Sequence, residues 1–133
     1  MKFYIASSLK NRELVRYVAR RLENKGHVLT YDWTKNERVE NYEDLKAIGE
    51  AEIKGVKEAD FVVMLMPGGV GSHVELGIAL GLGKRVYLYT QDHDIYDITN
   101  TCTFYYVNGV HKFAGFIENF ILEIDKYESK LLH

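Results

Sequence analysis

The sequence predicts an α/β fold of three layers, in which a five-stranded parallel sheet carries helices on both faces. Short apolar segments alternate with amphipathic ones along almost the whole chain, and this alternation is typical of a parallel sheet. The 133 residues, 47% of them hydrophobic, supply one core. No linker, repeat or low-complexity tract interrupts them, so we expect one domain over residues 1–133.

The first third of the chain is expected to form a strand, a helix and a second strand. Residues 2–6 (KFYIA) are β-branched and aromatic and are followed by serines. A helix is predicted over residues 11–26, with Gly26 at its end. Residues 27–33 (HVLTYDW) form the second expected strand. The apolar residues of the helix recur at helical spacing: Leu14, Val15, Val18 and Leu22.

The middle of the chain continues the alternation. A second helix is predicted over residues 42–59, and residues 60–67 form a buried strand that stops at the only proline, Pro67. Residues 68–84 supply a third helix, and residues 85–89 (RVYLY) supply a fourth strand. In that third helix, Gly77 and Gly81 lie one turn apart and form a smooth strip for close packing, and Gly83 marks its end.

The last part of the chain has a weaker strand signal and a strong helical one. Residues 103–107 (TFYYV) are expected to be the fifth strand. The last helix is expected to begin at His111 and to place its large apolar side chains on one stripe, for a core or a dimer contact. These side chains are Phe113, Phe116, Ile117, Phe120, Ile121, Ile124 and Tyr127.

Five strands in so short a chain favour the flavodoxin- or Rossmann-like order 2-1-3-4-5. Sheets of this kind bind ligands outside the carboxyl ends of the strands, where the strand order reverses. Here the reversal falls between the first and third strands. We therefore expect the loops at residues 7–10 and 67–73 to face the functional site.

Composition excludes several classes of function. The net charge of −2 does not resemble the basic surface of a nucleic-acid binder. A single cysteine, Cys102, excludes an internal disulfide and a cysteine-rich metal site. No segment has the signature of a signal peptide or a membrane span. We expect a cytoplasmic protein that binds neither membrane nor nucleic acid.

Glu75 is the first candidate for chemistry, and it has two interpretations. With Ser72 it matches the S-x-x-E capping box, a purely structural arrangement. A carboxylate in the first turn of a helix also feels the positive end of the helix dipole and stays ionised. At the carboxyl edge of the sheet, such a carboxylate can attack an electrophilic carbon.

Glu52 is the second candidate, because it lies on the centre of the apolar stripe of its helix. A charged side chain there must snorkel, pair or face a polar cavity, unless the helix phase is blurred. Two carboxylates that converge on one cleft are the arrangement that glycosidic chemistry uses.

Two loops at the expected edge carry candidate ligand-binding residues. Ser8 and Lys10 precede a helix N-terminus, which suits either an anion site or an ordinary helix cap. The turn PGGVG (67–71) lacks the spacing of a P-loop or a dinucleotide fingerprint, but it allows a ligand to approach the backbone closely. His73 is the histidine best placed to meet a substrate.

The segment GSHVELGIALGLGKRVYLY resembles the signature of the nucleoside 2-deoxyribosyltransferase superfamily, in which the glutamate of E-L-G-x-A-x-x-x-G-K is the nucleophile. That match places the nucleophile at Glu75. The stretch EIKGVKEADFVV is similar to a segment in which the family has Asp where this chain has Glu52. Tyr4 matches the tyrosine that hydrogen-bonds the nucleophile. The likeness runs from residue 2 to about residue 107.

The resemblance implies an enzyme that needs no metal or cofactor. YIASSLKNRE looks like the branch that hydrolyses deoxynucleoside monophosphates, with Ser8 and Lys10 at its phosphate-contacting positions. GSHVELG is similar to the pyrimidine-monophosphate N-glycosidases. Gly69 departs from both the base-binding Asp of the transferases and the phosphate-binding Ser of the hydrolases. The 5′ end of the substrate is then expected at Ser8, Lys10 and the backbone of residues 69–72, which include Gly69, Gly71 and Ser72, and His73 is expected to contact the substrate as well.

The predicted function is cleavage of the N-glycosidic bond of a nucleoside or nucleoside 5′-monophosphate, with Glu75 as nucleophile, Tyr4 to orient it and Glu52 as acid or substrate clamp. Three alternatives are a base-exchanging deoxyribosyltransferase, a non-catalytic nucleotide-binding or sensor domain, and cleavage of NAD-like dinucleotides. Family members are usually oligomers, so a homo-oligomer, such as a dimer, is expected.

Overall fold

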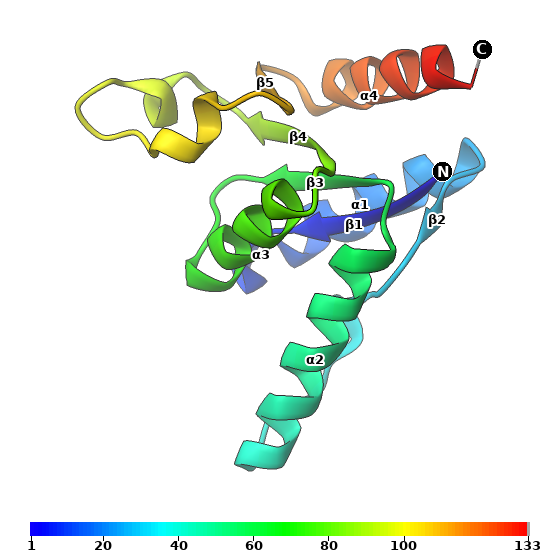
Figure 1. Ribbon diagram of the computed structural model, residues 1–133, viewed down its shortest axis with the longest axis vertical. Helices are drawn as coiled ribbons and strands as arrows, with labels where there is room; N and C mark the ends of the chain where they lie inside the picture. The colour runs from blue at the N-terminus through cyan, green and yellow to red at the C-terminus, as the bar shows by residue number, and fades with distance from the viewer. Residues whose placement is uncertain (133) are drawn as a thin grey trace.

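The computed structural model describes residues 1–132 and has the expected sheet. Its five strands are parallel and follow the order β2-β1-β3-β4-β5, as Figure 1 shows. Four long helices alternate with them. In chain order the elements are β1 (Lys2–Ala6), α1 (Arg12–Asn24), β2 (Val28–Leu29), α2 (Tyr42–Glu58), β3 (Phe61–Leu65), α3 (Val70–Gly81), β4 (Arg85–Thr90), β5 (Val110–Ala114) and α4 (Ile117–Leu131).

The helices cover the sheet in two pairs, which makes the three-layer sandwich that the sequence predicts. Helices α2 and α3 pack together on one face, and α1 and α4 pack together on the other. Strand β3 at the centre has all five residues buried, because a strand covered on both faces has no exposed side. The fully buried side chains include large aromatic ones: Phe3, Tyr4, Phe61 and Phe120.

The prediction for the end of the chain was wrong in its boundaries. Residues Thr103–Tyr106 form a short 3₁₀ helix, and the fifth strand is β5, seven residues later than predicted. Helix α4 therefore begins at Ile117, and His111 and Phe113 belong to β5. The error arose because Phe113 falls in phase with the apolar stripe of α4.

The second strand is also shorter than predicted. Only Val28–Leu29 pair with β1, whereas residues 27–33 were expected to. The chain then turns into a 3₁₀ helix, Trp33–Lys35, which the Asp32 side chain caps by accepting from the Thr34 N–H. The Trp33 indole donates to the Ile5 carbonyl at 2.7 Å, so a side chain joins this segment to β1 where the strand pairing has ended.

A buried carboxylate paired with a half-buried arginine anchors the end of α4 to the sheet. Glu128 is 0% exposed. Its carboxylate accepts two hydrogen bonds from the Arg85 guanidinium, at 2.8 and 2.7 Å, and a third from the Tyr87 hydroxyl. Since a buried carboxylate needs a counter-charge and full hydrogen bonding, this cluster ties α4 to β4.

Within residues 1–132, the helices are either too short or too polar to cross a membrane.

Candidate active site

Three side chains predicted for the site meet on the α2/α3 face of the sheet. Tyr4 is fully buried in the middle of β1. Its hydroxyl donates to Glu75 Oε2 of α3 at 2.5 Å. Glu52 Oε2 of α2 lies 3.5 Å from the same hydroxyl, a long contact. One tyrosine from the sheet thus stands between two carboxylates from two different helices.

The capping box predicted for Glu75 is wrong. Helix α3 begins at Val70 with Gly69 as its N-cap, so Ser72 occupies the third helical position. Ser72 Oγ accepts from the Gly69 N–H at 2.6 Å and donates to the Gly69 carbonyl at 2.9 Å. Glu75 lies three residues further on, in the second turn, and is 6% exposed. Its carboxylate is therefore free of any capping role.

This position changes the electrostatics expected for Glu75. Its pKa is raised from 4.5 to about 9, chiefly by burial. A hydrogen bond with Glu52 and the charge of Glu52 also raise the pKa, while the hydrogen bond from Tyr4 lowers it. Burial and then the charge of Glu75 raise the pKa of Tyr4 far above its ordinary range, so Tyr4 stays a donor. The carboxyl pair thus holds a proton at neutral pH.

The raised pKa predicts a dependence of stability on pH. The folded protein keeps the Glu75 proton until about pH 9, whereas an unperturbed glutamate loses it near 4.5. The free energy of unfolding should therefore fall as pH rises through this window, by up to about 1.4 kcal/mol per pH unit. Urea unfolding of the wild type and Glu75→Gln at a series of pH values gives this slope as their difference. A constant difference across the window would contradict the raised pKa.

Glu52 reaches Tyr4 because α2 lies close to β1 at Gly55. A Cβ atom at Gly55 would lie 3.0 Å from Tyr4 Cδ2 and 3.0 Å from Tyr31 Cβ. Gly55 is buried, so only glycine fits there without moving the Tyr4 ring. Sequence reasoning missed Gly55, since a glycine inside a helix gives no sign of what it will face.

The loops after β1 and β3 lie together, as predicted from the strand order. Ser7 Oγ donates to the Leu65 carbonyl at 2.7 Å, and Asn11 Nδ2 donates to Ser7 Oγ at 3.1 Å and to the Met66 carbonyl at 3.3 Å. Next to these hydrogen bonds, the Ser8 hydroxyl is buried and has no hydrogen-bond partner among the described residues. Lys10 is exposed next to it, just before α1.

The remaining predicted binding residues lie at the start of α3. Gly69 and Gly71 are exposed there, whereas Ser72 is 3% exposed and occupied by the helix cap. His73 uses both ring nitrogens within the protein. Nδ1 lies 2.8 Å from the Gly69 carbonyl and so carries the proton, and Nε2 then accepts from the Tyr105 hydroxyl at 2.7 Å.

Tyr105 is a second residue that sequence reasoning missed. It is 4% exposed, and through His73 it ties the segment between β4 and β5 to the helix that carries Glu75. The contact could not be expected from the sequence, because residues 103–107 were predicted to form a strand and in fact begin with a 3₁₀ helix. No group of three or more metal-binding side chains gathers anywhere in residues 1–132.

The chain is similar to known proteins both in sequence and in fold. The sequence model of the family described as nucleoside 2-deoxyribosyltransferase matches residues 3–122. No curated protein sequence matches the chain significantly.

Three solved structures are similar in fold. A CMP N-glycosidase from Clostridium botulinum, BcmB, has a TM-score of 0.68 at 20% identity, over 96% of this chain and 99% of that one. A 2-deoxyribosyltransferase from Bacillus psychrosaccharolyticus has a TM-score of 0.67 at 20% identity, over 96% and 92%. A conserved protein from Enterococcus faecalis V583 has a TM-score of 0.63 at 22% identity, over 96% and 98%.

Proposed function

The chain belongs to the nucleoside 2-deoxyribosyltransferase family of enzymes, and from that premise we propose that it hydrolyses the N-glycosidic bond of a nucleoside or nucleoside 5′-monophosphate. The observation that carries the proposal is the shared Tyr4 hydroxyl between Glu75 and Glu52. A structurally similar protein is a CMP N-glycosidase, which supports a hydrolase that acts on a monophosphate.

In the first step, the ionised Glu75 carboxylate attacks C1′ of the sugar through an oxocarbenium-like transition state. The bond from C1′ to the base nitrogen breaks, and a glycosyl ester forms on Glu75. The proton that the carboxyl pair holds passes through Glu52 to the departing base. This transfer leaves Glu75 ionised at the moment of attack. Without the transfer, the raised pKa of Glu75 would keep it protonated at neutral pH.

In the second step, water attacks C1′ and the ester oxygen of Glu75 departs as carboxylate. Glu52, which has lost its proton to the base, accepts a proton from this water, so the pair returns to its starting state. Two displacements at C1′ retain the configuration of the sugar. Throughout, the Tyr4 hydroxyl holds the Glu75 carboxylate in one orientation.

The 5′ end of the substrate is proposed to lie between the two loops at the carboxyl edge. The unpartnered Ser8 hydroxyl, the charge of Lys10 and the backbone N–H of Gly71 form a set of groups that suits a phosphate, whereas the Gly69 N–H is already bonded to Ser72 Oγ. His73 helps to fix the start of α3 beside this set, because its ring hydrogen-bonds the Gly69 carbonyl.

The experiment that tests the function is chromatography of free base released from ribo- and deoxyribonucleosides, with and without a 5′-phosphate. Each substrate is run with and without an added acceptor base. Release into water without acceptor is the expected result. Exchange that requires the acceptor would make the protein a transferase instead. This alternative is retained because a protein of similar fold is a 2-deoxyribosyltransferase. Binding without any release would support the sensor alternative, and release of nicotinamide from NAD would support the dinucleotide one.

Tyr4→Phe is expected to lower kcat by about 10–100-fold, since a hydrogen bond to a charged group contributes about 1.5–3 kcal/mol. The ring remains in place, so KM should change little. Because Tyr4 lowers the pKa of Glu75, the carboxyl pair of the variant should keep its proton to a higher pH, so the loss of activity at alkaline pH should shift upward. Tyr89→Phe is the matched control, because Tyr89 also loses one hydrogen bond, to the Gly115 carbonyl. Equal kcat values for the two variants would contradict the role of Tyr4.

The oligomer expected from the family is proposed to form through the α2/α3 face. Part of the stripe on α4 serves the core, with Phe120, Ile121 and Ile124 buried, whereas Phe116 is 80% and Tyr127 40% exposed. On α3, Val70 is 87% and Val74 57% exposed, and no atom lies within 4 Å of a Cβ built at Gly77 or Gly81. The strip predicted for close packing is thus open within the protomer. The first turns of α2 extend beyond the sheet beside it (Figure 1), with residues 41–47 all exposed.

Val74→Lys is therefore expected to convert a dimer into a monomer, measured by light scattering coupled to size exclusion. A lysine there would place a charge in the apolar contact. Leu122→Lys, at a side chain of similar exposure on α4, is the control and should remain dimeric. A monomeric wild type, or dissociation by the control alone, would contradict this interface.

A further inference from the structure

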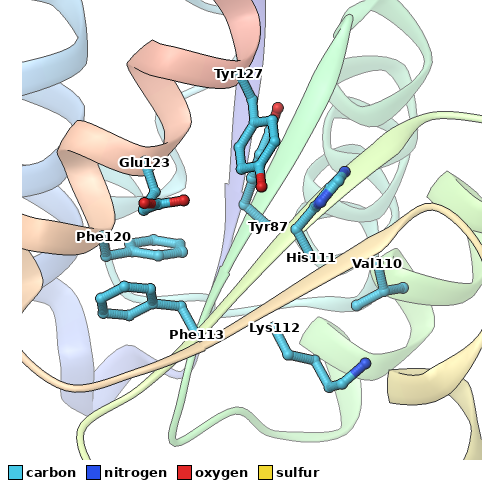
Figure 2. Close-up of a pocket in the computed structure, with 8 residues that line it drawn as sticks. All are labelled: Tyr87, Val110, His111, Lys112, Phe113, Phe120, Glu123 and Tyr127. Carbon is cyan, nitrogen blue, oxygen red and sulfur yellow. The ribbon is translucent and has the colours of Figure 1, made fainter.

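A cavity of about 310 Å³ opens between β5 and α4, on the opposite face of the sheet from Glu75. Figure 2 shows it between side chains of both elements. The lining residues of α4 (Phe120, Glu123 and Tyr127) recur at helical spacing and so share one face of the helix. His111 and Phe113 of β5 are two residues apart and so lie on one face of the strand. The full set of lining residues is Tyr87, Val110, His111, Lys112, Phe113, Phe120, Glu123 and Tyr127.

Aromatic rings form two sides of the cavity. The His111 ring stacks on the Tyr87 ring at 5.1 Å and is tilted by 32° to the Tyr127 ring at 5.1 Å, centroid to centroid, so these rings turn part of their faces to one another. The Phe113 and Phe120 rings are 5.7 Å apart, and Figure 2 shows them on the other side of the space from Tyr127 and His111. The faces of such rings carry partial negative charge and attract cations.

The cavity also carries a negative charge without a counter-charge. Glu123 is partly buried in its lining, and its carboxylate makes no hydrogen bond or ion pair within residues 1–132. The lining cation, Lys112, is turned away: its Nζ donates to the Tyr105 carbonyl at 3.3 Å and lies 4.9 Å from the Tyr106 ring centroid. Lys130 approaches the Tyr127 ring at 5.9 Å, but it does not line the cavity.

We propose that this cavity binds a small methylated ammonium cation. One carboxylate and an aromatic wall stabilise a positive charge that is spread over methyl groups. A primary ammonium or a guanidinium would need three to five hydrogen-bond acceptors. The cavity offers few, because the Tyr87 hydroxyl is already bonded to Glu128. Tyr127 is 40% exposed at the rim, so a ligand can enter from solvent.

The test is a titration of the full chain with choline. Binding is monitored by NMR through the ring proton resonances of the aromatic residues. The neutral isostere 3,3-dimethylbutan-1-ol is titrated in parallel, since it has the same shape without the charge. Choline should bind at least about tenfold more tightly than the isostere. Glu123→Gln should weaken choline binding by about tenfold and leave isostere binding unchanged. Tyr127→Leu should weaken choline binding as well.

Two controls separate this site from the proposed active site. Glu50→Gln removes an exposed carboxylate on α2 and should bind choline as the wild type does. Glu75→Gln, which should not turn over substrate, should also bind choline normally. Equal affinity for choline and its isostere, no binding of choline, or unchanged choline binding by Glu123→Gln would each overturn the proposal. Thermal unfolding of each variant shows that loss of binding is not loss of fold.

Discussion

Glu75→Gln is expected to reduce base release by at least about 10⁴-fold, the scale of loss when a covalent nucleophile is removed. The glutamine amide has nearly the same shape and can still accept from the Tyr4 hydroxyl, which donates to Glu75 Oε2 at 2.5 Å. It cannot form a glycosyl ester. The rate of base release is measured on whichever substrate the panel identifies. A Glu75→Gln variant within tenfold of the wild-type rate would rule out Glu75 as the nucleophile.

A second variant separates the nucleophile from the acid. Glu52→Gln should slow release of an ordinary base, but a substrate whose leaving group needs no proton should restore its first step. Glu75→Gln should not be restored in this way. The second step of Glu52→Gln then lacks a base for water, so the glycosyl ester should accumulate and increase the mass of the intact protein. Restoration of both variants, or of neither, would contradict the division of roles between the two carboxylates.

Glu128→Gln is expected to lower the free energy of unfolding by about 1.5–3 kcal/mol, the second large effect. The substitution leaves the Arg85 guanidinium without its counter-charge and weakens the bond from the Tyr87 hydroxyl. Such a loss is a large fraction of the stability of a domain of this size, so Tm should fall by about 5–10 °C. Urea and thermal unfolding measure both quantities.

An exposed ion pair on the same helix provides the control. Glu118 accepts from Arg21 and Tyr17 of α1, and its side chain is 49% exposed. Solvent screens this pair, so Glu118→Gln should destabilise the fold far less than Glu128→Gln does. The double substitution Arg85→Met with Glu128→Leu should recover most of the stability, because neither charge then remains buried. Equal losses for Glu118→Gln and Glu128→Gln would show that burial does not set the importance of the pair.

The central part of the fold follows from sequence periodicity. Strands β1, β3 and β4 are continuous apolar runs, and they lie at the positions expected of strands covered on both faces. Strand β5 was misplaced because it is an edge strand with a mixed sequence (VHKFA) and a partly exposed face. Its apolar residues match the helical period of α4, and only pairing with β4 distinguishes the two.

The site was predictable to a lesser degree. Tyr4, Glu52 and Glu75 are separated by up to 71 residues along the chain, and the strand order together with the family signature indicated where to look. The register of α3 was not predictable, because Gly69 and Ser72 begin the helix before the Ser-x-x-Glu pattern would. That difference moves Glu75 from an exposed cap to a buried carboxyl group.

The sequence by itself determined the layer architecture, the strand order and which side chains are candidates for the chemistry, because periodicity and local signatures are properties of neighbouring residues. Tertiary structure alone decided the protonation of Glu75, the approach of α2 at Gly55 and the aromatic cavity under α4. Each of these depends on burial and on contacts between distant segments. Desolvation and packing are set by what surrounds a group in space, and no local pattern along the chain records them.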